Sequence, residues 1–223
     1  MLVKKLGFHL AQEFYHYNPA RLPAPAEWVN VRRVRVKDSV NVVWWLSKST
    51  QPKADNRKVL REYSESMKAL LKNGYRAKLR PSGHDISENF SKDNGGAIPP
   101  NLLELANTES NSSYLKLCRA HGLRPHPARY PADFVRFFLK FLTDEDDLVL
   151  DPFAGSNTTG WICEQMRRRW IAGELEADYF TGSCHRFLDG SLVEAAITIE
   201  QNGVRRVNVK SKAIATTAGV IAG

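Results

Sequence analysis

The stretch DLVLDPFAGSNTTG at residues 147–160 constrains the fold of this chain more than any other part of the sequence. Its apolar residues 148–150 predict a short strand buried on both faces, and Thr158 or Thr159 can begin the following helix as its N-cap. A second apolar run at residues 170–172 leads to Glu174. This order predicts an α/β fold with a βαβ unit, a nucleotide-type ligand at the loop, and an acid placed to bind ribose hydroxyls.

The residues and charge of the loop limit the classes of ligand that it can bind. Gly155-x-Asn157-x-x-Gly160 has the dinucleotide-binding spacing, but the Asn157 side chain occupies the place where a pyrophosphate needs bare backbone. Asparagine tolerates the left-handed conformation, so the turn is retained. Asp151 would repel a pyrophosphate and attract a cationic ligand that carries a ribose, as S-adenosylmethionine does. Taken alone, Asp151 could simply end the strand in a turn, and Glu174 could be an acid exposed to solvent. The occurrence of both residues in this order and at this spacing favours a ligand site.

The sequence HPARYP at residues 126–131 precedes an apolar-rich segment, 134–142, which is predicted to be helical, and then the loop. Residues 126–174 closely resemble the DNA amino-methyltransferases of the beta arrangement, which modify N4 of cytosine or N6 of adenine. Residues 6–19 and 40–48 resemble strands of that family's catalytic half, so the resemblance covers residues 2 to about 187. It implies a Rossmann-like S-adenosylmethionine-dependent methyltransferase sheet with helices on both faces and a less regular target-recognition region.

In that family, the His-Pro-Ala segment (motif X) and the Asp-Pro-Phe-Ala-Gly-Ser loop (motif I) both hold S-adenosylmethionine. Asn157 replaces the second loop glycine of the commoner pattern, a departure that cytosine-N4 members share. Carried over by position, the resemblance implies a cofactor site lined by His126, Pro127, Ala128, Asp151, Phe153, Ala154, Gly155, Ser156, Thr158 and Glu174.

The family's catalytic tetrapeptide, Ser/Asp/Asn-Pro-Pro-aromatic (motif IV), does not occur among the 223 residues. The single Pro-Pro, at residues 99–100, lies between Ile98 and Asn101 and is predicted to be a loop without a catalytic role. We therefore expect no catalytic residue in this chain, which by itself would bind S-adenosylmethionine but transfer no methyl group. A preceding polypeptide segment or a second subunit would supply motif IV.

The resemblance also divides the chain. Residues 1–49 correspond to catalytic-half strands, 50–122 to the target-recognition region, 123–190 to the cofactor half with motifs X, I and II, and 191–223 to a C-terminal tail. The tail is predicted to be flexible or to form an edge strand through residues 204–209.

Local patterns predict further elements. Residues 33–37 alternate strictly and precede an apolar run at 40–46, which predicts a β-hairpin. Trp44 and Trp45 are adjacent and so face opposite sides of the strand, and both are predicted to be core residues. An amphipathic helix is predicted at 63–73, with Met67, Leu70 and Leu71 on its core face.

The net charge of +8 implies an acidic partner, for which double-stranded DNA is the natural candidate beside methyltransferase motifs. Lysine and arginine at strand edges can also serve to prevent edge pairing, so a basic cluster alone does not establish a binding face. The predicted DNA-binding residues are Arg32, Arg33, Arg35, Lys37, Lys48, Lys53, Arg57 and Lys58.

The three cysteines, Cys118, Cys163 and Cys184, have neither an even number nor metal-ligand spacing, so we expect a reducing compartment and no metal site. The sequence has no apolar stretch approaching ~18 residues and no signal-peptide core, which predicts a cytoplasmic protein without membrane contact.

Two alternatives to a methyltransferase remain at this point. One is a non-catalytic DNA-binding remnant of a methyltransferase gene, and the other is an NAD-type dehydrogenase that binds its cofactor with the same βαβ unit. Asp151 and Asn157 argue against the dehydrogenase because both disfavour a pyrophosphate. Between the two target bases, Asn157 and the polar stretch at 107–112 favour cytosine N4. The recognised DNA sequence does not follow from the residues.

Overall fold

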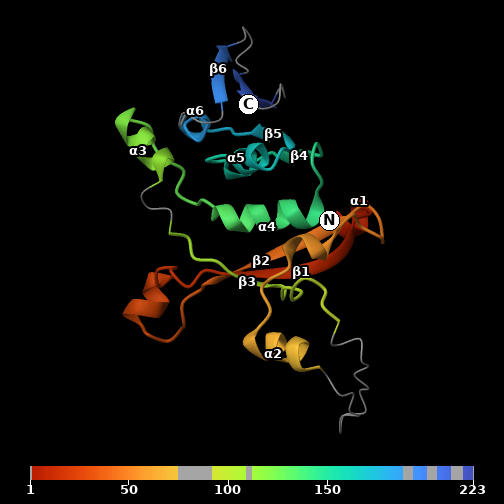
Figure 1. The fold of residues 1–223 in the computed structure, drawn as a ribbon. Coiled ribbons are helices and arrows are strands. Elements are labelled where there is room, and N and C mark those ends of the chain that lie inside the picture. Colours follow the sequence, from red (N-terminus) through yellow and green to blue (C-terminus); the bar gives the residue numbers. More distant parts are fainter. Residues whose placement is uncertain are drawn as a thin grey trace.

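The computed structural model describes residues 2–74, 92–108 and 112–187, together with the backbone of three later strands. Figure 1 shows a sheet near the N-terminus, a central helix α4 and a second sheet beyond it. In chain order the elements are α1 (Leu2–Leu6), β1 (His9–Tyr17), η1 (Glu27–Val31), β2 (Val40–Ser47), η2 (Asn56–Val59), α2 (Glu65–Asn73), β3 (Leu102–Glu104), α3 (Ser113–Ala120), α4 (Ala132–Leu142), β4 (Leu148–Asp151), α5 (Thr158–Gln165), β5 (Arg169–Gly173), α6 (Ala177–Cys184), β6 (Val193–Ile199), β7 (Arg205–Ser211) and β8 (Ala218–Ala222).

The predicted βαβ unit is present. β4 and β5 are parallel, with Leu150 opposite Ile171, and α5 forms the crossover between them. The second sheet continues in the order β4-β5-β8-β7-β6. The first sheet has the order β2-β1-β3, in which β1 is antiparallel to β2 and parallel to β3. Parallel strands joined by a helix confirm the predicted α/β class.

Helix α4 forms the centre of the core because its aromatic residues pack in two directions. The ring of Phe14 on β1 meets the rings of Phe138 and Phe141 at centroid distances of 5.2 and 6.0 Å, both in edge geometry. Other buried residues of α4 belong to the cluster that contains Trp170 of β5 and Phe180 of α6. Burial of such side chains stabilises the fold by roughly 1.5–3 kcal/mol each, so α4 joins the two sheets.

The predicted hairpin at residues 33–46 is wrong. β2 pairs with β1, and residues 18–39 form a long excursion between them that contains η1. Val34 and Val36 are 66% and 88% exposed, and Arg33 has a φ of 55°. The alternating valines at 34 and 36 therefore form no buried face, and the left-handed backbone of Arg33 interrupts the extended conformation that a strand requires.

Two predictions of burial are also wrong. Trp44 is 62% exposed on the outer face of β2, whereas Trp45 packs on Phe141 at a centroid distance of 5.1 Å, as predicted. Leu148 and Leu150 are 56% and 66% exposed rather than buried on both faces. β4 lies at the edge of its sheet, and only the side of Val149 packs on the core cluster.

The helix predicted at 63–73 exists as α2, which begins after the N-cap Ser64. Its residues Met67, Leu70 and Leu71 are half-buried and lie outside the core clusters, which corrects their prediction as core residues. The helix at 134–142 and the loop at Pro99–Pro100 are confirmed. In the tail, β7 lies between β6 and β8 rather than at an edge. Part of the region expected to be flexible lies outside the described residues, as do residues 109–111 of the polar stretch at 107–112.

Candidate functional site

The loop begins with Asp151 at the end of β4. One carboxylate oxygen, Oδ1, accepts a hydrogen bond from the backbone N–H of Phe153 (3.1 Å), and Oδ2 accepts one from the hydroxyl of Thr159 (2.6 Å). The carboxylate thereby connects the end of the strand to the first turn of α5. Asp151 is half-buried, and these two hydrogen bonds hold its carboxylate at the loop.

Asn157 begins helix α5. Its backbone is left-handed, with φ 51° and ψ 45°, as predicted, and its Oδ1 accepts a hydrogen bond from the N–H of Gly160 (2.9 Å). The predicted cap at Thr158 or Thr159 is therefore wrong, since a left-handed Asn157 places its own amide under the first helical turn. A Cβ at residue 160 would lie 2.5 Å from Asn157 Oδ1, which explains the glycine three residues later.

Glu174 reaches the same loop from the end of β5. Its Oε2 accepts a hydrogen bond from the backbone N–H of Gly155 (2.7 Å), and its Oε1 accepts one from the N–H of Glu176 (2.9 Å). The backbone N–H of Ala154 donates to the carbonyl of Gly173 (2.9 Å). The acid that the sequence places at the end of the second strand thus contacts the glycine turn after the first.

His126 lies against this turn. Gly155 has a φ of 55°, and a Cβ at this position would lie 3.1 Å from atoms of the His126 ring, so a larger residue would displace the ring. The same ring meets Tyr179 of α6 edge-on at 4.7 Å. The Nδ1 atom of His126 is buried and has no hydrogen-bond partner among the described residues. The segments predicted as motif X and motif I are therefore in contact.

The remaining predicted cofactor residues differ in accessibility. Phe153 is 89% exposed, and Pro127 and Ala128 are exposed as well. Ser156 and Thr158 are buried, with their hydroxyl oxygens 3.3 Å apart. Their side chains therefore support the loop from within, whereas Phe153 and Ala128 are open to a ligand.

A hollow of about 1000 Å³ adjoins Ala128. It is bordered by the first sheet, by α4 and by the segment after His126. Its polar lining includes Asn18, whose Oδ1 accepts hydrogen bonds from the backbone N–H groups of Ala20 (3.1 Å) and Asn107 (3.3 Å). Its apolar lining includes Val42 and Trp44 from β2.

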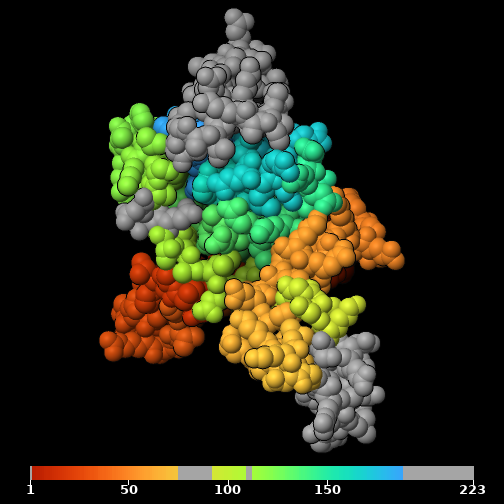
Figure 2. All heavy atoms as spheres, in the orientation of Figure 1, coloured from red at the N-terminus to blue at the C-terminus, as the bar shows by residue number. Residues whose placement is uncertain are grey.

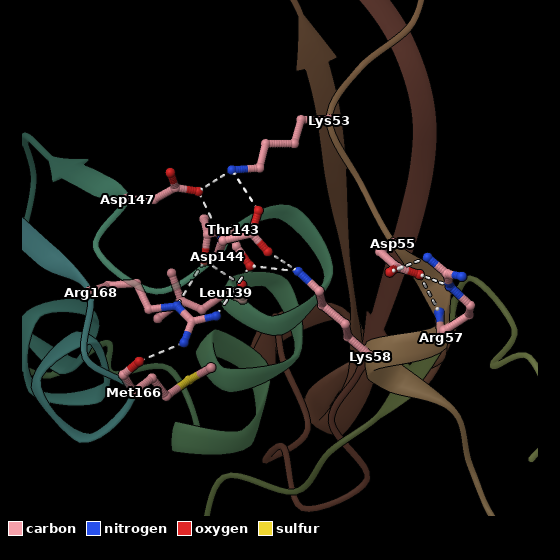
Figure 3. Close-up of polar contacts among 10 residues, drawn as sticks. All are labelled: Lys53, Asp55, Arg57, Lys58, Leu139, Thr143, Asp144, Asp147, Met166 and Arg168. Atoms are coloured by element: carbon pink, nitrogen blue, oxygen red, sulfur yellow. Dashed lines mark hydrogen bonds and ion pairs between the residues drawn. The ribbon is translucent and has the colours of Figure 1, made fainter. Parts of the chain in front are cut away.

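Most of the predicted DNA-binding residues have partners within the chain. Figure 3 shows Lys53 between Asp144 and Asp147, at 2.8 and 2.5 Å, and Lys58 also in contact with Asp144. These hydrogen bonds to Lys53 and Lys58 lower the pKa of Asp144 to about 2. Arg57 pairs with Asp55 (2.9 Å), which lowers the pKa of that carboxyl. All of these groups lie at the surface.

The residues between 32 and 48 are engaged in a similar way. Arg32 pairs with Glu27 (2.8 Å), and Arg35 lies 3.7 Å from Asp38. Lys37 donates to the carbonyls of Pro19 and Arg21, and Lys48 to that of Leu6. Arg33 makes no ion pair or hydrogen bond to any residue that the structure describes.

The cysteines are buried and unbridged, and burial raises the pKa of Cys163 to about 12 and that of Cys184 to about 11. Within the described ranges there is no cluster of histidine, cysteine or acidic residues suited to a metal ion. The same ranges contain no helix long and apolar enough to cross a membrane.

Sequence reasoning missed two buried residues that contact the site, Tyr114 on α3 and Arg186 just after α6. The hydroxyl of Tyr114 accepts a hydrogen bond from the backbone N–H of His126 (3.0 Å), and Arg186 donates to Ser156. Both lie far from the loop in sequence, and no local pattern distinguishes them from surface residues.

Comparison with known proteins agrees with this geometry. A family model described as DNA methylase matches residues 1–184. The type II methyltransferase M.PvuII of Proteus hauseri is 52% identical over 200 residues, which are 88% of this chain and 60% of the relative. M.Cfr9I of Citrobacter freundii is 39% identical over 54 residues, 24% of this chain and 18% of the relative.

Among solved structures, the cytosine-N4-specific PvuII DNA methyltransferase superposes with a TM-score of 0.66 at 42% identity, over 86% of this chain and 55% of that one. The chain thus spans about three-fifths of its Proteus relative. An NAD-type dehydrogenase is excluded by these matches. The chain belongs to the DNA methylase family of amino-methyltransferases, enzymes whose methyl donor is S-adenosylmethionine.

Proposed function

We propose that residues 126–128, the loop at 151–158 and Glu174 bind S-adenosylmethionine in this chain. The observation that carries the proposal is the meeting of all three segments at Gly155, which donates to Glu174 and lies under the His126 ring. In this proposal the carboxylate of Glu174 binds the ribose, and Asp151 supplies negative charge for a cationic ligand. Calorimetric titration should show binding of S-adenosylmethionine and none of NAD; the reverse would contradict the assignment.

The proposed reaction is methylation of an exocyclic amino nitrogen in double-stranded DNA by the complete enzyme, with cytosine N4 as the target. The identity to a cytosine-N4-specific enzyme and the Asn157 loop support cytosine. An amino nitrogen inside the base stack cannot approach the donor in line, so the base must rotate out of the duplex. The sulfonium already activates the methyl group, and the protein contributes orientation. Mass spectrometry of nucleosides from methylated DNA distinguishes N4-methylcytosine from N6-methyladenine.

The group that accepts a hydrogen bond from the target amino group is proposed to come from outside these 223 residues, through a preceding segment or a second polypeptide that carries motif IV. Asn18 beside Pro19 is the nearest substitute in the sequence, but its Oδ1 already accepts two backbone hydrogen bonds. The exposed apolar residues Val42 and Trp44 beside the hollow fit the packing of a further segment there. Incorporation of labelled methyl into duplex DNA by the purified chain would refute this.

For DNA binding, we propose that the basic residues at 32–58 and the target-recognition region at 50–122 face the duplex. Within that region, β3 pairs with β1 and α3 packs against α6. Figure 2 shows the lobe around residues 18–39 and α2 projecting from the body of the protein, where they are accessible to a large partner. The alternative, a non-catalytic DNA-binding remnant, predicts DNA binding without methyl transfer even when a polypeptide that carries motif IV is supplied.

A further inference from the structure

Arg186 holds the cofactor loop from the side of α6. Its Nε donates to the carbonyl oxygen of Ser156 (2.6 Å), and its Nη2 donates to the hydroxyl of the same residue (3.0 Å). Arg186 is only 5% exposed. The guanidinium group offers several donors in a fixed planar fork, so it can satisfy both acceptors of one residue at once. A lysine ammonium is a point charge and cannot reproduce this geometry.

The same guanidinium also contacts two aromatic rings. Its central carbon lies 4.7 Å from the ring centroid of Tyr114 and 5.4 Å from that of Trp161. Trp161 belongs to α5, which follows the loop directly, and Tyr114 holds the backbone N–H of His126. Arg186 is therefore linked to motif I directly and to motif X through Tyr114.

The loop needs such support because of its backbone. Ser156 lies between two left-handed residues, Gly155 with φ 55° and Asn157 with φ 51°. Glycine adopts the left-handed conformation freely, whereas at Asn157 this conformation is disfavoured and persists because surrounding contacts hold it. The hydrogen bonds from Arg186 act on Ser156, the residue directly before Asn157. If they were lost, the buried carbonyl of Ser156 would lose its charged donor.

We propose that Arg186 is a positioning residue for the methyl donor. It fixes Ser156 and, through Tyr114, His126, and so sets the affinity for S-adenosylmethionine without touching that ligand. This inference rests on the proposed function of the loop as the S-adenosylmethionine site.

The test compares Arg186→Lys with a matched control in the full 223-residue chain. Arg168 also donates to backbone carbonyls, those of Met166 (2.5 Å) and Thr143 (3.1 Å), but among the described residues it makes no hydrogen bond to the loop. Calorimetry should show S-adenosylmethionine affinity reduced about tenfold in Arg186→Lys, the loss expected for one charge-assisted hydrogen bond. The affinity of Arg168→Lys for S-adenosylmethionine should stay within about twofold of the parent, even if its thermal midpoint falls as much as that of Arg186→Lys.

Hydrogen exchange provides a readout that a general loss of stability does not reproduce. If the two variants have the same thermal midpoint, the backbone amides of residues 154–158 should still exchange faster in Arg186→Lys than in Arg168→Lys. Equal affinities in Arg186→Lys and the parent, or equal losses in both variants, would overturn the role of Arg186. A parent chain that does not bind S-adenosylmethionine would instead contradict the proposed function.

A second variant keeps the inference testable where Arg186→Lys does not fold. Tyr114→Phe retains the ring beside Arg186 and removes the hydroxyl that accepts from the His126 backbone. We expect affinity for S-adenosylmethionine to fall about threefold to tenfold, the range for one hydrogen bond. Unchanged affinity in a folded Tyr114→Phe protein would remove the link between Arg186 and motif X.

Discussion

The proposed cofactor loop at residues 151–158 and the basic segment at residues 48–58 both contain charged side chains that contact neighbouring groups. These contacts have opposite effects on the ability of the two regions to bind a ligand. At the loop, Asp151 and, from the end of β5, Glu174 accept hydrogen bonds from backbone N–H groups and shape a candidate ligand site. In the segment, Lys53 and Lys58 pair with carboxylates near the end of α4. Internal contacts therefore create a site in the first region and occupy the charges in the second. The partners of the charged side chains, rather than their number, decide what a charged segment can bind.

The largest expected effect concerns the acids of the loop. Glu174→Ala and Asp151→Ala should each weaken S-adenosylmethionine binding by roughly 1–3 kcal/mol, the usual loss for a charge-assisted contact. Glu176→Ala is the matched control, because its carboxylate pairs with Arg124 (3.1 Å) at the surface. Glu174→Gln tests the cause: recovered affinity would show that an acceptor oxygen at this position suffices without the negative charge. Unchanged calorimetric affinity in both alanine variants would remove these residues from the site.

A smaller loss is expected when the turn itself is altered. Gly155→Ala adds a Cβ at φ 55°, 3.1 Å from the His126 ring, and should lower the free energy of unfolding by about 1–2 kcal/mol. In a double-mutant cycle with His126→Ala, the combined loss should be less than the sum of the single losses, because the steric contact is shared. Strictly additive losses would show that the two segments are independent. Chemical denaturation provides the measurement.

DNA binding tests the other side of the comparison. The logarithm of affinity falls with the logarithm of salt concentration, and each phosphate contact contributes roughly 0.9 to the slope. Arg33→Gln should lower the slope by about this amount, because Arg33 makes no ion pair within the described chain. Lys53→Gln should lower it less, since Lys53 is shared by Asp144 and Asp147. Equal decreases would show that the surface ion pairs open to meet phosphate.

The smallest effect should appear in stability at low pH. Lys53 and Lys58 depress the pKa of Asp144 to about 2 from 3.8, so its contribution to stability is present above about pH 4 and lost as the pH falls towards 2. Lys53→Gln should therefore reduce the thermal midpoint slightly at pH 6, and the difference should vanish near pH 2. Because the pair is exposed, added salt should reduce the difference as well. A difference that is independent of pH would contradict this origin.

The sequence predicted those parts of the fold that depend on local order. The βαβ unit, α4 and α2 each follow from apolar spacing within a short stretch. Long-range pairing was not predictable: β2 joins β1 across residues 18–39, where the alternating pattern suggested a local hairpin. The predictions that Leu148 and Trp44 are buried were wrong for the same reason. Burial of a strand residue depends on which distant elements cover the strand, and the spacing of apolar residues does not contain that information.

For the candidate site, the order and charge of the residues predicted that Glu174 lies at the loop, and the family resemblance added His126; in the structure Gly155 contacts both. Asn157 was predicted to tolerate the left-handed turn, but its second role as the cap of α5 follows only from three-dimensional geometry. Tyr114 and Arg186 gave no local signal, since their contacts with the site join distant segments.

The outer face of β4 and β5 has a consequence for the behaviour of this chain in solution. Leu148, Leu150 and Ile171 lie on one side of these strands and are exposed, and β4 is also the edge of its sheet. Among the described strands only β5 pairs with β4, and an apolar strand with one unpaired edge is a template for pairing with another copy. The isolated chain should therefore show concentration-dependent scattering, and a charged residue at position 150 should suppress it without altering the loop.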